Sequence, residues 1–403
     1  MIIPLSVRSI VTAAAAISSR GTQTTQPSLT SRAINVDHAR VATSAISALD
    51  SFYQKDNLVW KNVRGWIAAN VYNDIMDFDL FSHTRQHENT YGAALLTIAT
   101  SAAAQEKVGS VNDFNDDQLW WCLAMIRAYQ NYGHRAPLDQ AIRQWKSIGA
   151  NAQLSHADQG TTPSITPGGI QRDAAIPAGC DVDGAVYWSS QRSSGLNAIS
   201  TSLYAQVGAW LFALTGDAKT FRGPTDRALA WLQRVTLDPA TGIMVVDGLT
   251  VQGCKKNPGA LTYNTGVYIG ALTSMYMSTR DAKYLAAARI SVKSATTGAF
   301  GNSPPLVVSE ASALTTPGDA VQWRDILFRN LYDFYDSVNG VGQVDGVLKS
   351  QMQAFFRANY DQIQGKARFG NLYAANWFGK MSTGSDWGTG SVLSNLLGSM
   401  LLL

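Results

Sequence analysis

Segments of helical length, with apolar residues recurring at steps of three and four, constrain this chain more than any other feature. Stop signals such as Gly216-Asp217 and Pro317-Gly318 separate them. Strand-like alternation is scarce, and Ile243 to Val246 is one short candidate. The predicted helices occupy residues 37–53, 62–80, 89–105, 116–132, 137–147, 196–214, 219–235, 262–277, 281–294, 320–338, 346–358 and 388–402. This pattern predicts an all-α fold.

Neighbouring helices repeat an arrangement of helix, tight turn and helix. Leu211 to Asp217 leads into a helix that ends near Trp231, and Leu272 to Asp281 leads into another. About a dozen helices in such hairpins favour a closed double ring over a linear solenoid. Two stretches, 148–195 and 295–319, are instead rich in Gly, Ser, Thr and Pro. Loops of that length usually line or cover a functional site, so we expect them to lie along one face of the ring.

The N-terminus has the features of a secretory signal over residues 1–20. Arg8 precedes the apolar run Ile10 to Ile17, and small residues follow. A disordered or helical extension is the alternative. We expect a disordered linker at 21–34 and a single domain at 35–403, because no change in composition demands a second domain. The signal-like stretch predicts a secreted protein, extracellular or associated with the cell wall. No other segment is apolar for long enough to span a bilayer, so we expect no stable membrane insertion. We also expect a monomer.

Charge and cysteine content narrow the partners and the compartment. The formal charge is +3 over 403 residues, and no basic stripe indicates nucleic-acid binding. Such a surface suits a neutral ligand. Cys122 lies inside a predicted helix and is expected to be a buried thiol. Cys180 and Cys254 lie in glycine-containing loops, and in an oxidising compartment we expect them to form a disulfide.

Two adjacent carboxylates, Asp116 and Asp117, stand beside two adjacent indoles, Trp120 and Trp121. Asn115 is the expected N-cap, which places both acids at the first two helical positions. Acids are enriched there because they complement the helix dipole, and for an isolated pair that explanation is the more frequent one. Trp120, however, lies at i+4 and i+3 from the two acids and shares their face. Paired carboxylates with aromatic platforms suit the cleavage of a glycosidic bond.

The adjacency of Asp116 and Asp117 also bears on mechanism. Neighbouring helical residues splay by about 100°. Their carboxyl groups can still converge to about 5 Å, which suits retention better than the roughly 6.5–9.5 Å of inverting enzymes. One carboxyl group must be ionised and the other protonated, and like charges this close raise one pKa. Which residue keeps the proton depends on burial.

Two further clusters offer sugar-binding groups. Tyr187 and Trp188 are candidates for stacking on a sugar ring, with ordinary core packing as an equal alternative. Asp183 belongs to an Asp-x-Asp-Gly run that resembles a calcium loop, but the remaining ligand positions are absent. Tyr263 and Asn264 carry a hydroxyl and an amide suited to sugar hydroxyls, although Tyr263 also fits a core position.

Metal-dependent chemistry finds little support in the sequence. His83 and His87 have a spacing that can chelate zinc on a helix, but Glu88 follows the second histidine rather than the first. Their segment is polar and is predicted to be a solvated loop. A terpene-synthase magnesium motif would need a further aspartate after Asp117, and Gln118-Leu119-Trp120 does not supply it. We therefore expect no metal and no cofactor.

Taken in order, these motifs resemble glycoside hydrolase family 76, the α-1,6-mannanases of fungi and bacteria, over most of residues 35–403. The segments that carry the resemblance are Asp116-Asp117-x-x-Trp120-Trp121, Cys180 through Trp188, Asn197-Ala198-Ile199-Ser200, Cys254 with Thr262-Tyr263-Asn264-Thr265-Gly266, and Asn376-Trp377. The resemblance implies an (α/α)6 toroid and a retaining mechanism, with Asp116 as nucleophile and Asp117 as general acid/base. The residues expected to bind substrate are Trp120, Trp121, Tyr187, Trp188, Tyr263, Asn264 and Asp183.

The sequence departs from the family pattern near these residues. Phe114 replaces a usual Tyr, Asp181 and Asp183 replace glycines, and Thr265 replaces Gln. The expected activity is endo-cleavage of α-1,6-linked mannan, with subsite preference altered by these changes. Two alternatives are a cell-wall transglycosylase of the same family, in which a sugar hydroxyl replaces water, and a non-catalytic carbohydrate-binding toroid. A terpene-type helical enzyme would instead require magnesium.

Overall fold

The computed structural model describes residues 34–160, 176–190, 195–301, 306–309, 319–378 and 384–403. The predicted signal at 1–20 and all but the last residue of the predicted linker lie outside these ranges. Ile34, at the end of that linker, packs against the core. Within the described part of the chain, no helix combines the length and the apolar character needed to cross a bilayer.

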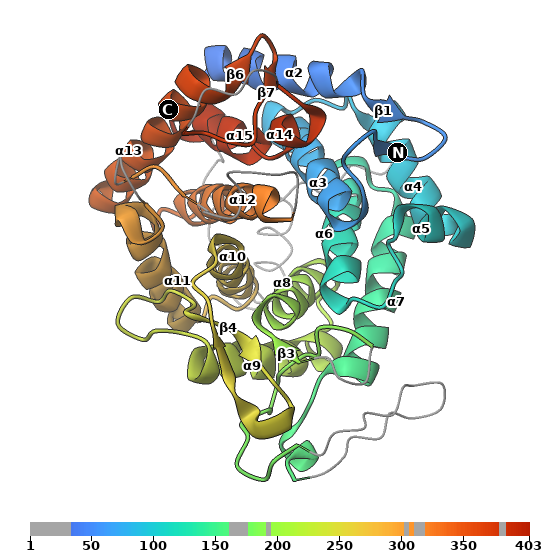
Figure 1. Cartoon of the computed structure of the whole chain (residues 1–403), viewed down its shortest axis with the longest axis vertical. Coiled ribbons are helices and arrows are strands. Elements are labelled where there is room, and N and C mark those ends of the chain that lie inside the picture. The colour runs from blue at the N-terminus through green and yellow to red at the C-terminus, as the bar shows by residue number, and fades with distance from the viewer. Residues whose placement is uncertain (1–33, 161–175, 191–194, 302–305, 310–318, 379–383) are drawn as a thin grey trace, which may run out of the picture.

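The helices form a closed double ring (Figure 1). The inner helices are α3 (Gly65–Ser82), α6 (Asn115–Tyr132), α8 (Ala198–Thr215), α10 (Thr262–Thr279), α12 (Ala320–Asn339) and α15 (Leu393–Leu402). The outer helices are α2 (Val36–Asp50), α4 (Ala93–Thr100) with α5 (Ala102–Val108), α7 (Arg135–Ala152), α9 (Ala218–Val235), α11 (Ala282–Ser294) and α13 (Gly346–Gln362). Each inner helix contacts the next, and α15 contacts α3, which closes the ring. The predicted all-α (α/α)6 toroid is confirmed.

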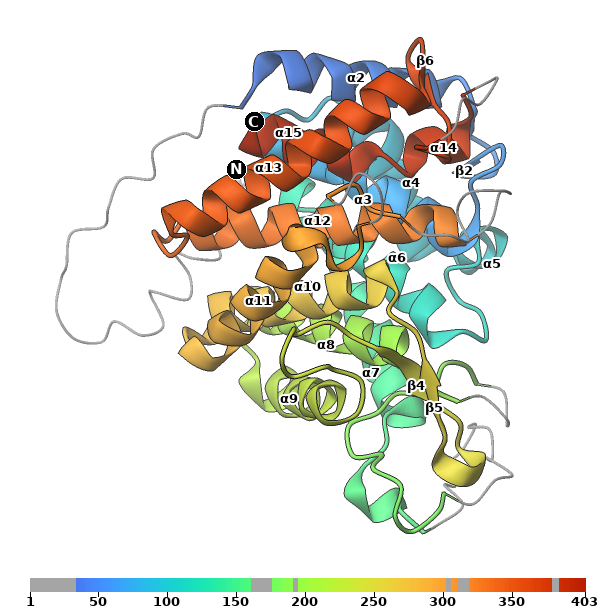
Figure 2. The ribbon, with the colours of Figure 1, turned by 60° about the vertical axis from the view of Figure 1, so that its left-hand side comes forward.

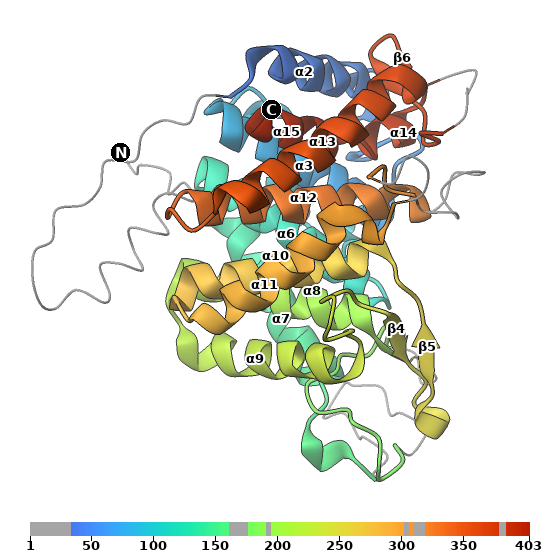
Figure 3. The ribbon, with the colours of Figure 1, turned by 90° about the vertical axis from the view of Figure 1, so that its left-hand side faces the viewer.

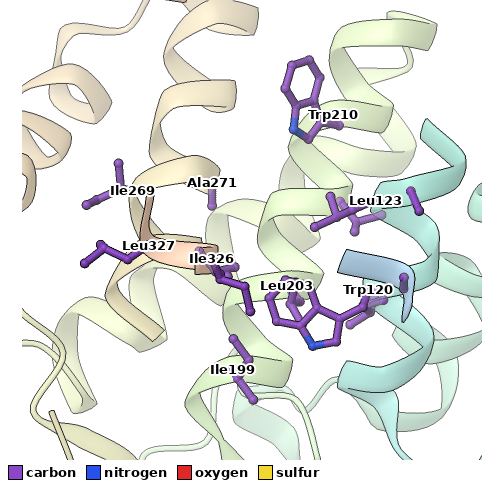
Figure 4. Packing of buried hydrophobic residues seen from close by; sticks show 14 of the residues in the cluster. Trp120, Leu123, Ile199, Leu203, Trp210, Ile269, Ala271, Ile326 and Leu327 are labelled. Carbon is purple, nitrogen blue, oxygen red and sulfur yellow. The ribbon is translucent and has the colours of Figure 1, made fainter. Parts of the chain in front are cut away.

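Burial explains which helices lie inside. Nearly every residue of α8 and α10 is buried, because an inner helix is covered on all sides. The outer helices α7 and α9 bury one face only. In Figure 3 the outer helices α9, α11 and α13 lie along one side of the molecule. Figure 4 shows apolar side chains of the inner helices gathered within the ring, among them Trp120, Leu203 and Ile326.

Hydrogen bonds join the first and last hairpins. The buried Asp386 of α14 (Asp386–Gly390) accepts from the backbone N–H of Asn62 at 2.8 Å and from its side-chain amide at 3.0 Å. The backbone N–H of Asn35 donates to the carbonyl of Met400 at 2.9 Å. These contacts span almost the whole chain, so ring closure depends on residues far apart in sequence.

Short elements complete the fold. The strands are β1 (Tyr53–Gln54), β2 (Val59–Trp60), β3 (Leu196–Asn197), β4 (Val246–Leu249), β5 (Lys256–Pro258), β6 (Arg368–Phe369) and β7 (Leu372–Tyr373). The single-turn helices are η1 (Glu88–Gly92), η2 (His156–Asp158), η3 (Gln252–Cys254), η4 (Ala295–Ala299) and η6 (Ile363–Ala367). Strands β3, β4 and β5 form one antiparallel sheet, and β4 and β5 lie beside the start of α10 (Figure 2).

Three local predictions need correction or comment. The expected strand at Ile243 to Val246 is displaced, since β4 begins at Val246 and Met244 forms only an isolated bridge. The predicted helix at 89–105 is interrupted at Ser101, whose hydroxyl caps α5. The expected cysteine states are confirmed: Cys180 and Cys254 form a disulfide, and Cys122 is buried and free.

Candidate active site

A cavity of about 520 Å³ opens at the end of the ring where the inner helices begin. Its lining residues are Trp66, Phe114, Asp116, Asp117, Trp120, Trp188, Gly195, Leu196, Asn197, Asp247, Gly248, Leu249, Asn257, Tyr263, Asp319 and Trp323. They come from the N-terminal ends of α3, α6, α8, α10 and α12, and from the β3–β5 sheet. Trp188, Gly195 and Asp319 belong to the two long stretches that were expected to line one face. Helix N-termini carry partial positive charge, which favours anionic groups at this end of the ring.

The start of α6 differs from the prediction that Asn115 is its N-cap. Phe114 is the N-cap and supplies no side-chain cap, while Asn115 is already the first helical residue. The amide of Asn115 donates instead to the backbone carbonyl of Tyr187 at 2.8 Å. The side-chain oxygen of Asn112 accepts from the backbone N–H of Phe114 at 2.8 Å. Asp116 and Asp117 are therefore the second and third helical residues, and Asn115 anchors the loop that carries Trp188.

Each carboxylate of the pair accepts a hydrogen bond from a neutral donor. The indole N–H of Trp188 donates to Asp116 Oδ2 at 3.1 Å. The amide of Asn112 donates to Asp117 Oδ2 at 2.8 Å. Asp116 Oδ1 is buried, and no partner for it exists among the described residues. Both acids line the cavity, so the pair is held by the protein and open to a ligand.

Burial shifts both pKa values upward. Burial, followed by the neighbouring charge of Asp117, raises the pKa of Asp116 to about 8, and the Trp188 hydrogen bond opposes this rise. Burial also raises the pKa of Asp117 to about 6, with Asn112 lowering it and the charge of Asp319 raising it. Between these two values the pair holds one proton, and the higher pKa favours Asp116 as its carrier.

Aromatic pairs form three sections of the cavity wall. Trp66 stacks on Trp120 with ring centroids 5.9 Å apart, and Tyr263 stacks on Trp323 at 4.9 Å. Phe114 packs against Trp188 at 4.9 Å. Such rings present apolar faces next to polar groups, an arrangement that suits the alternating faces and hydroxyls of a sugar chain.

The structure brings five of the predicted site residues together in this cavity, namely Asp116, Asp117, Trp120, Trp188 and Tyr263. Trp121 and Tyr187 do not line it, because their side chains are fully buried in the core. Asn264 is also buried, and its amide donates to Asp247 Oδ1 at 2.9 Å. Asn264 therefore contacts Asp247, which does line the cavity, rather than the cavity itself.

Asp183 also lies outside the cavity lining. Its carbonyl accepts from Arg234 at 3.1 Å, and the same guanidinium pairs with the Asp181 carboxylate at 2.7 Å and 2.9 Å. This ion pair lowers the pKa of Asp181. The negative charge of Asp181, one of the departures expected to alter subsite preference, is thus balanced by Arg234 away from the cavity.

Sequence reasoning missed several residues of the lining, among them Trp66, Asp247, Asn257, Asp319 and Trp323. A usable signal existed for two of them. Once a ring of inner helices is assumed, residues in the first turn of each inner helix are candidates, and Trp66 and Trp323 occupy such positions. Asp247 and Asn257 lie on β4 and β5, where no motif marks them.

The polar segment with the two histidines lies away from the cavity. His83 ends α3 in a left-handed conformation, and His87 Nδ1 lies 2.9 Å from Asp79 Oδ1. Among the described residues, no group of three or more His, Cys, Asp or Glu side chains is arranged to hold a metal ion. Of the described residues that line the cavity, none is Lys, Arg or His.

Solved structures of similar fold, all at low sequence identity, include α-mannanases and a glucosamine-bound protein. One is an α-1,6-mannanase from Salegentibacter sp. HEL1_6, in an inactive variant with two aspartates replaced by asparagine and with α-1,6-mannotriose bound. It is 17% identical to this chain, with a TM-score of 0.74, and the match covers 91% of this chain and 100% of that one. Dfg5 from Chaetomium thermophilum in complex with glucosamine is 16% identical, with a TM-score of 0.67 and 91% of each chain covered. These likenesses concern the fold.

The α-mannanase BT2949 from Bacteroides thetaiotaomicron is 16% identical, with a TM-score of 0.63, 90% of this chain covered and 95% of that one. No curated protein sequence shows significant similarity to this chain. The family model for Glycosyl hydrolase family 76 matches residues 37–401, which include the cavity and all but the two end residues of the ring of helices. The chain therefore belongs to glycosyl hydrolase family 76.

Proposed function

We propose that this protein is a retaining glycoside hydrolase that cleaves α-1,6-mannosidic linkages within mannan chains. The observation that carries the proposal is the Asp116–Asp117 pair, which opens into an aromatic-walled cavity and shares one proton near neutral pH. The mannotriose complex of the Salegentibacter relative supports the substrate class. The cavity lining, which has no cationic side chain among its described residues, suits a neutral glycan.

In the first step of the proposed reaction, Asp116 attacks the anomeric carbon and forms a glycosyl ester. The bond from that carbon to the glycosidic oxygen breaks, and Asp117 donates its proton to the departing oxygen. In the second step, the Asp117 carboxylate takes a proton from water while the water oxygen attacks the anomeric carbon. The ester bond breaks, Asp116 is ionised again and Asp117 is protonated again, so one water molecule is consumed per linkage.

These roles require the shared proton to be on Asp117 in the reactive complex. By the pKa values of the two groups alone, this proton resides on Asp116. Positive charge developing at the anomeric carbon stabilises an ionised Asp116, and the leaving oxygen accepts the Asp117 proton. The proposal therefore includes a relocation of one proton between two neighbouring carboxyl groups when substrate binds.

The proposal extends to the setting of the enzyme. We place it outside the cell or in the cell wall, as a monomer whose catalytic domain covers residues 35–403 and needs no metal or cofactor. Residues 1–20, which have the character of a secretory signal, and the Cys180–Cys254 disulfide support an oxidising compartment.

Incubation of unbranched α-1,6-mannan with the wild type, Asp116→Ala and Asp117→Ala, followed by chromatography of the products, tests this function. We expect shorter mannan chains from the wild type alone. Full activity in either variant would overturn the mechanism, and an inactive wild type would overturn the substrate. Adding an oligosaccharide acceptor distinguishes hydrolysis from transfer, because a transglycosylase would extend the acceptor instead of releasing new reducing ends.

A further inference from the structure

Trp188 combines two features that its expected role as a sugar platform does not require. Its side chain is 43% exposed, which is high for a tryptophan, and its ring lies against Phe114 at the cavity edge. The indole N–H is nevertheless directed at the catalytic pair and donates to Asp116 Oδ2 at 3.1 Å. A platform needs only the ring face, whereas this contact uses the one polar group of the side chain.

The backbone around Trp188 is fixed from two directions. The carbonyl of Trp188 accepts from the backbone N–H of Asn115 at 2.8 Å, at the first residue of α6. The N–H of Trp188 donates to the carbonyl of Gly195 at 2.9 Å, next to β3. Two residues further along the chain, the N–H of Ser190 donates to the carbonyl of Asp113 at 2.7 Å. The loop that carries Trp188 is therefore held by backbone hydrogen bonds against the start of α6, which also carries Asp116.

We propose that Trp188 is a positioning residue of the reaction, whose indole N–H fixes the direction of the Asp116 carboxylate and supports its negative charge. This inference rests on the proposed function, because it assigns Asp116 the role of the attacking carboxylate. A carboxylate oxygen offers two lone pairs, so Oδ2 can accept the indole N–H without losing its second lone pair.

The surroundings of Asp116 make this donor consequential. Asp117 lies next to it on α6, Asp247 reaches the same cavity from β4, and Asp319 reaches it from the start of α12. Among the described lining residues no cationic side chain offsets these acids. The indole N–H of Trp188 opposes the rise in the pKa of Asp116 that burial and the charge of Asp117 cause. Removing the donor should raise this pKa further and make the ionised Asp116 rarer.

Trp188→Phe keeps an aromatic ring and removes the N–H. We expect kcat on mannan to fall about ten-fold with little change in KM, and the alkaline limb of the pH profile to move up by about one unit, as for the loss of a charge-assisted hydrogen bond. Trp323→Phe is the matched control, since Trp323 lines another section of the aromatic wall by stacking on Tyr263. It should change KM and leave the alkaline limb in place. An unshifted limb in Trp188→Phe, with wild-type kcat, would overturn the inference.

A measurement without substrate separates this inference from the proposed function. With ¹⁵N-labelled tryptophan, the indole N–H signal of Trp188 is identified by its absence in Trp188→Phe. We expect it to titrate with an apparent pKa of about 8 in the wild type and to lose this titration in Asp116→Asn. A signal that does not titrate, or that titrates equally in Asp116→Asn, would overturn the inference. If the wild type failed to cleave mannan, the proposed function would fall, and this titration would still decide whether Trp188 holds Asp116.

Discussion

Two groups of carboxylates lie within the ring, and they are treated in opposite ways. The cavity group consists of Asp116, Asp117, Asp247 and Asp319, and no Lys, Arg or His accompanies it among the described lining residues. The buried network consists of Asp74, Asp77, Asp325, Asp333, Arg127, Arg329 and Tyr332, from α3, α6 and α12. Trp120 connects the two regions, since it lines the cavity while Arg329 lies 5.8 Å from its ring centroid.

In the buried network, arginines offset the acids. Arg127 contacts Asp77 at 2.9 Å and Asp333 at 2.5 Å, and Arg329 lies 3.4 Å from Asp74. The Tyr332 hydroxyl donates to Asp77 at 2.6 Å. Charges that are paired and hydrogen-bonded in this way tie helices together. Burial raises the pKa of acids in both groups, but in the cavity neutral donors rather than arginines hold the catalytic pair. The comparison teaches that carboxylates paired with arginine serve the structure. Carboxylates without a cationic partner, here called uncompensated, are available for chemistry.

The largest expected effect tests the cavity side of this comparison. Asp117→Asn removes the proposed acid/base but keeps its shape, so kcat on mannan should fall by about 10³-fold or more. The melting temperature should stay within about 2 °C of the wild type or rise, because the change removes the negative charge of Asp117 next to Asp116. Reducing-end assays and calorimetry on the same preparation check both expectations. A large fall in melting temperature alongside the loss of activity would mean that Asp117 also supports the fold. The distinction between the two groups would then fail.

The second effect tests the buried network. Arg127→Met leaves Asp77 and Asp333 without their shared cation, and we expect a loss of about 3–5 kcal/mol in the free energy of unfolding. Arg234→Met is the matched control, because it breaks an exposed pair with Asp181 and should cost less than about 1 kcal/mol. Urea unfolding of both variants gives the numbers. Equal small losses would show that the buried arginines do not support the fold.

A smaller effect concerns pH and stability. The pKa of Asp116 is raised from 3.8 to about 8 by folding, so between these values the native state binds more protons than the unfolded state. Stability contributed by this group is therefore present below pH 3.8 and is lost as pH rises through about 8. Asp116→Asn should lose less stability than the wild type between pH 4 and pH 8, as measured by unfolding at several pH values. A variant that tracks the wild-type curve would contradict the raised pKa.

The smallest effect concerns the loop acids that replace family glycines. Asp183 lies outside the cavity lining, and Asp181 is paired with Arg234. Asp183→Gly should leave KM for mannan within about two-fold of the wild type, since the removed charge is not in the binding cavity. Steady-state kinetics on mannan oligosaccharides check this. A larger change in KM would mean that Asp183 contributes to substrate binding and belongs with the cavity acids.

The sequence predicted the ring well because helical periodicity and stop signals are local. Every predicted helical window overlaps an α-helix of the structure. Asp116, Asp117 and Trp188 were found because paired acids and an adjacent aromatic pair carry chemical meaning on their own. The direction of neighbouring side chains was not predictable. Tyr187 turns into the core and Trp188 toward the cavity, and only the pairing of this segment with β3 and α6 decides between them.

Contacts between distant segments account for the rest. Asn264 was expected to meet the substrate, but β4 brings Asp247 between Asn264 and the cavity. The prediction of Asn115 as N-cap was wrong: its side-chain amide donates instead to the carbonyl of Tyr187, which lies 72 residues away in sequence. The arginine network that balances Asp77 and Asp333 joins α6 to α3 and α12, and no local pattern announces it.

The central claim is that the uncompensated neighbours Asp116 and Asp117 break the glycosidic bond by double displacement. The most direct test is ¹H NMR of the reducing ends released from unbranched α-1,6-mannan, recorded before the anomers equilibrate. The account predicts that the α-anomer appears first and the β-anomer follows by mutarotation. A β-anomer that appears first would contradict it, because inversion needs a water molecule between more widely separated carboxyl groups.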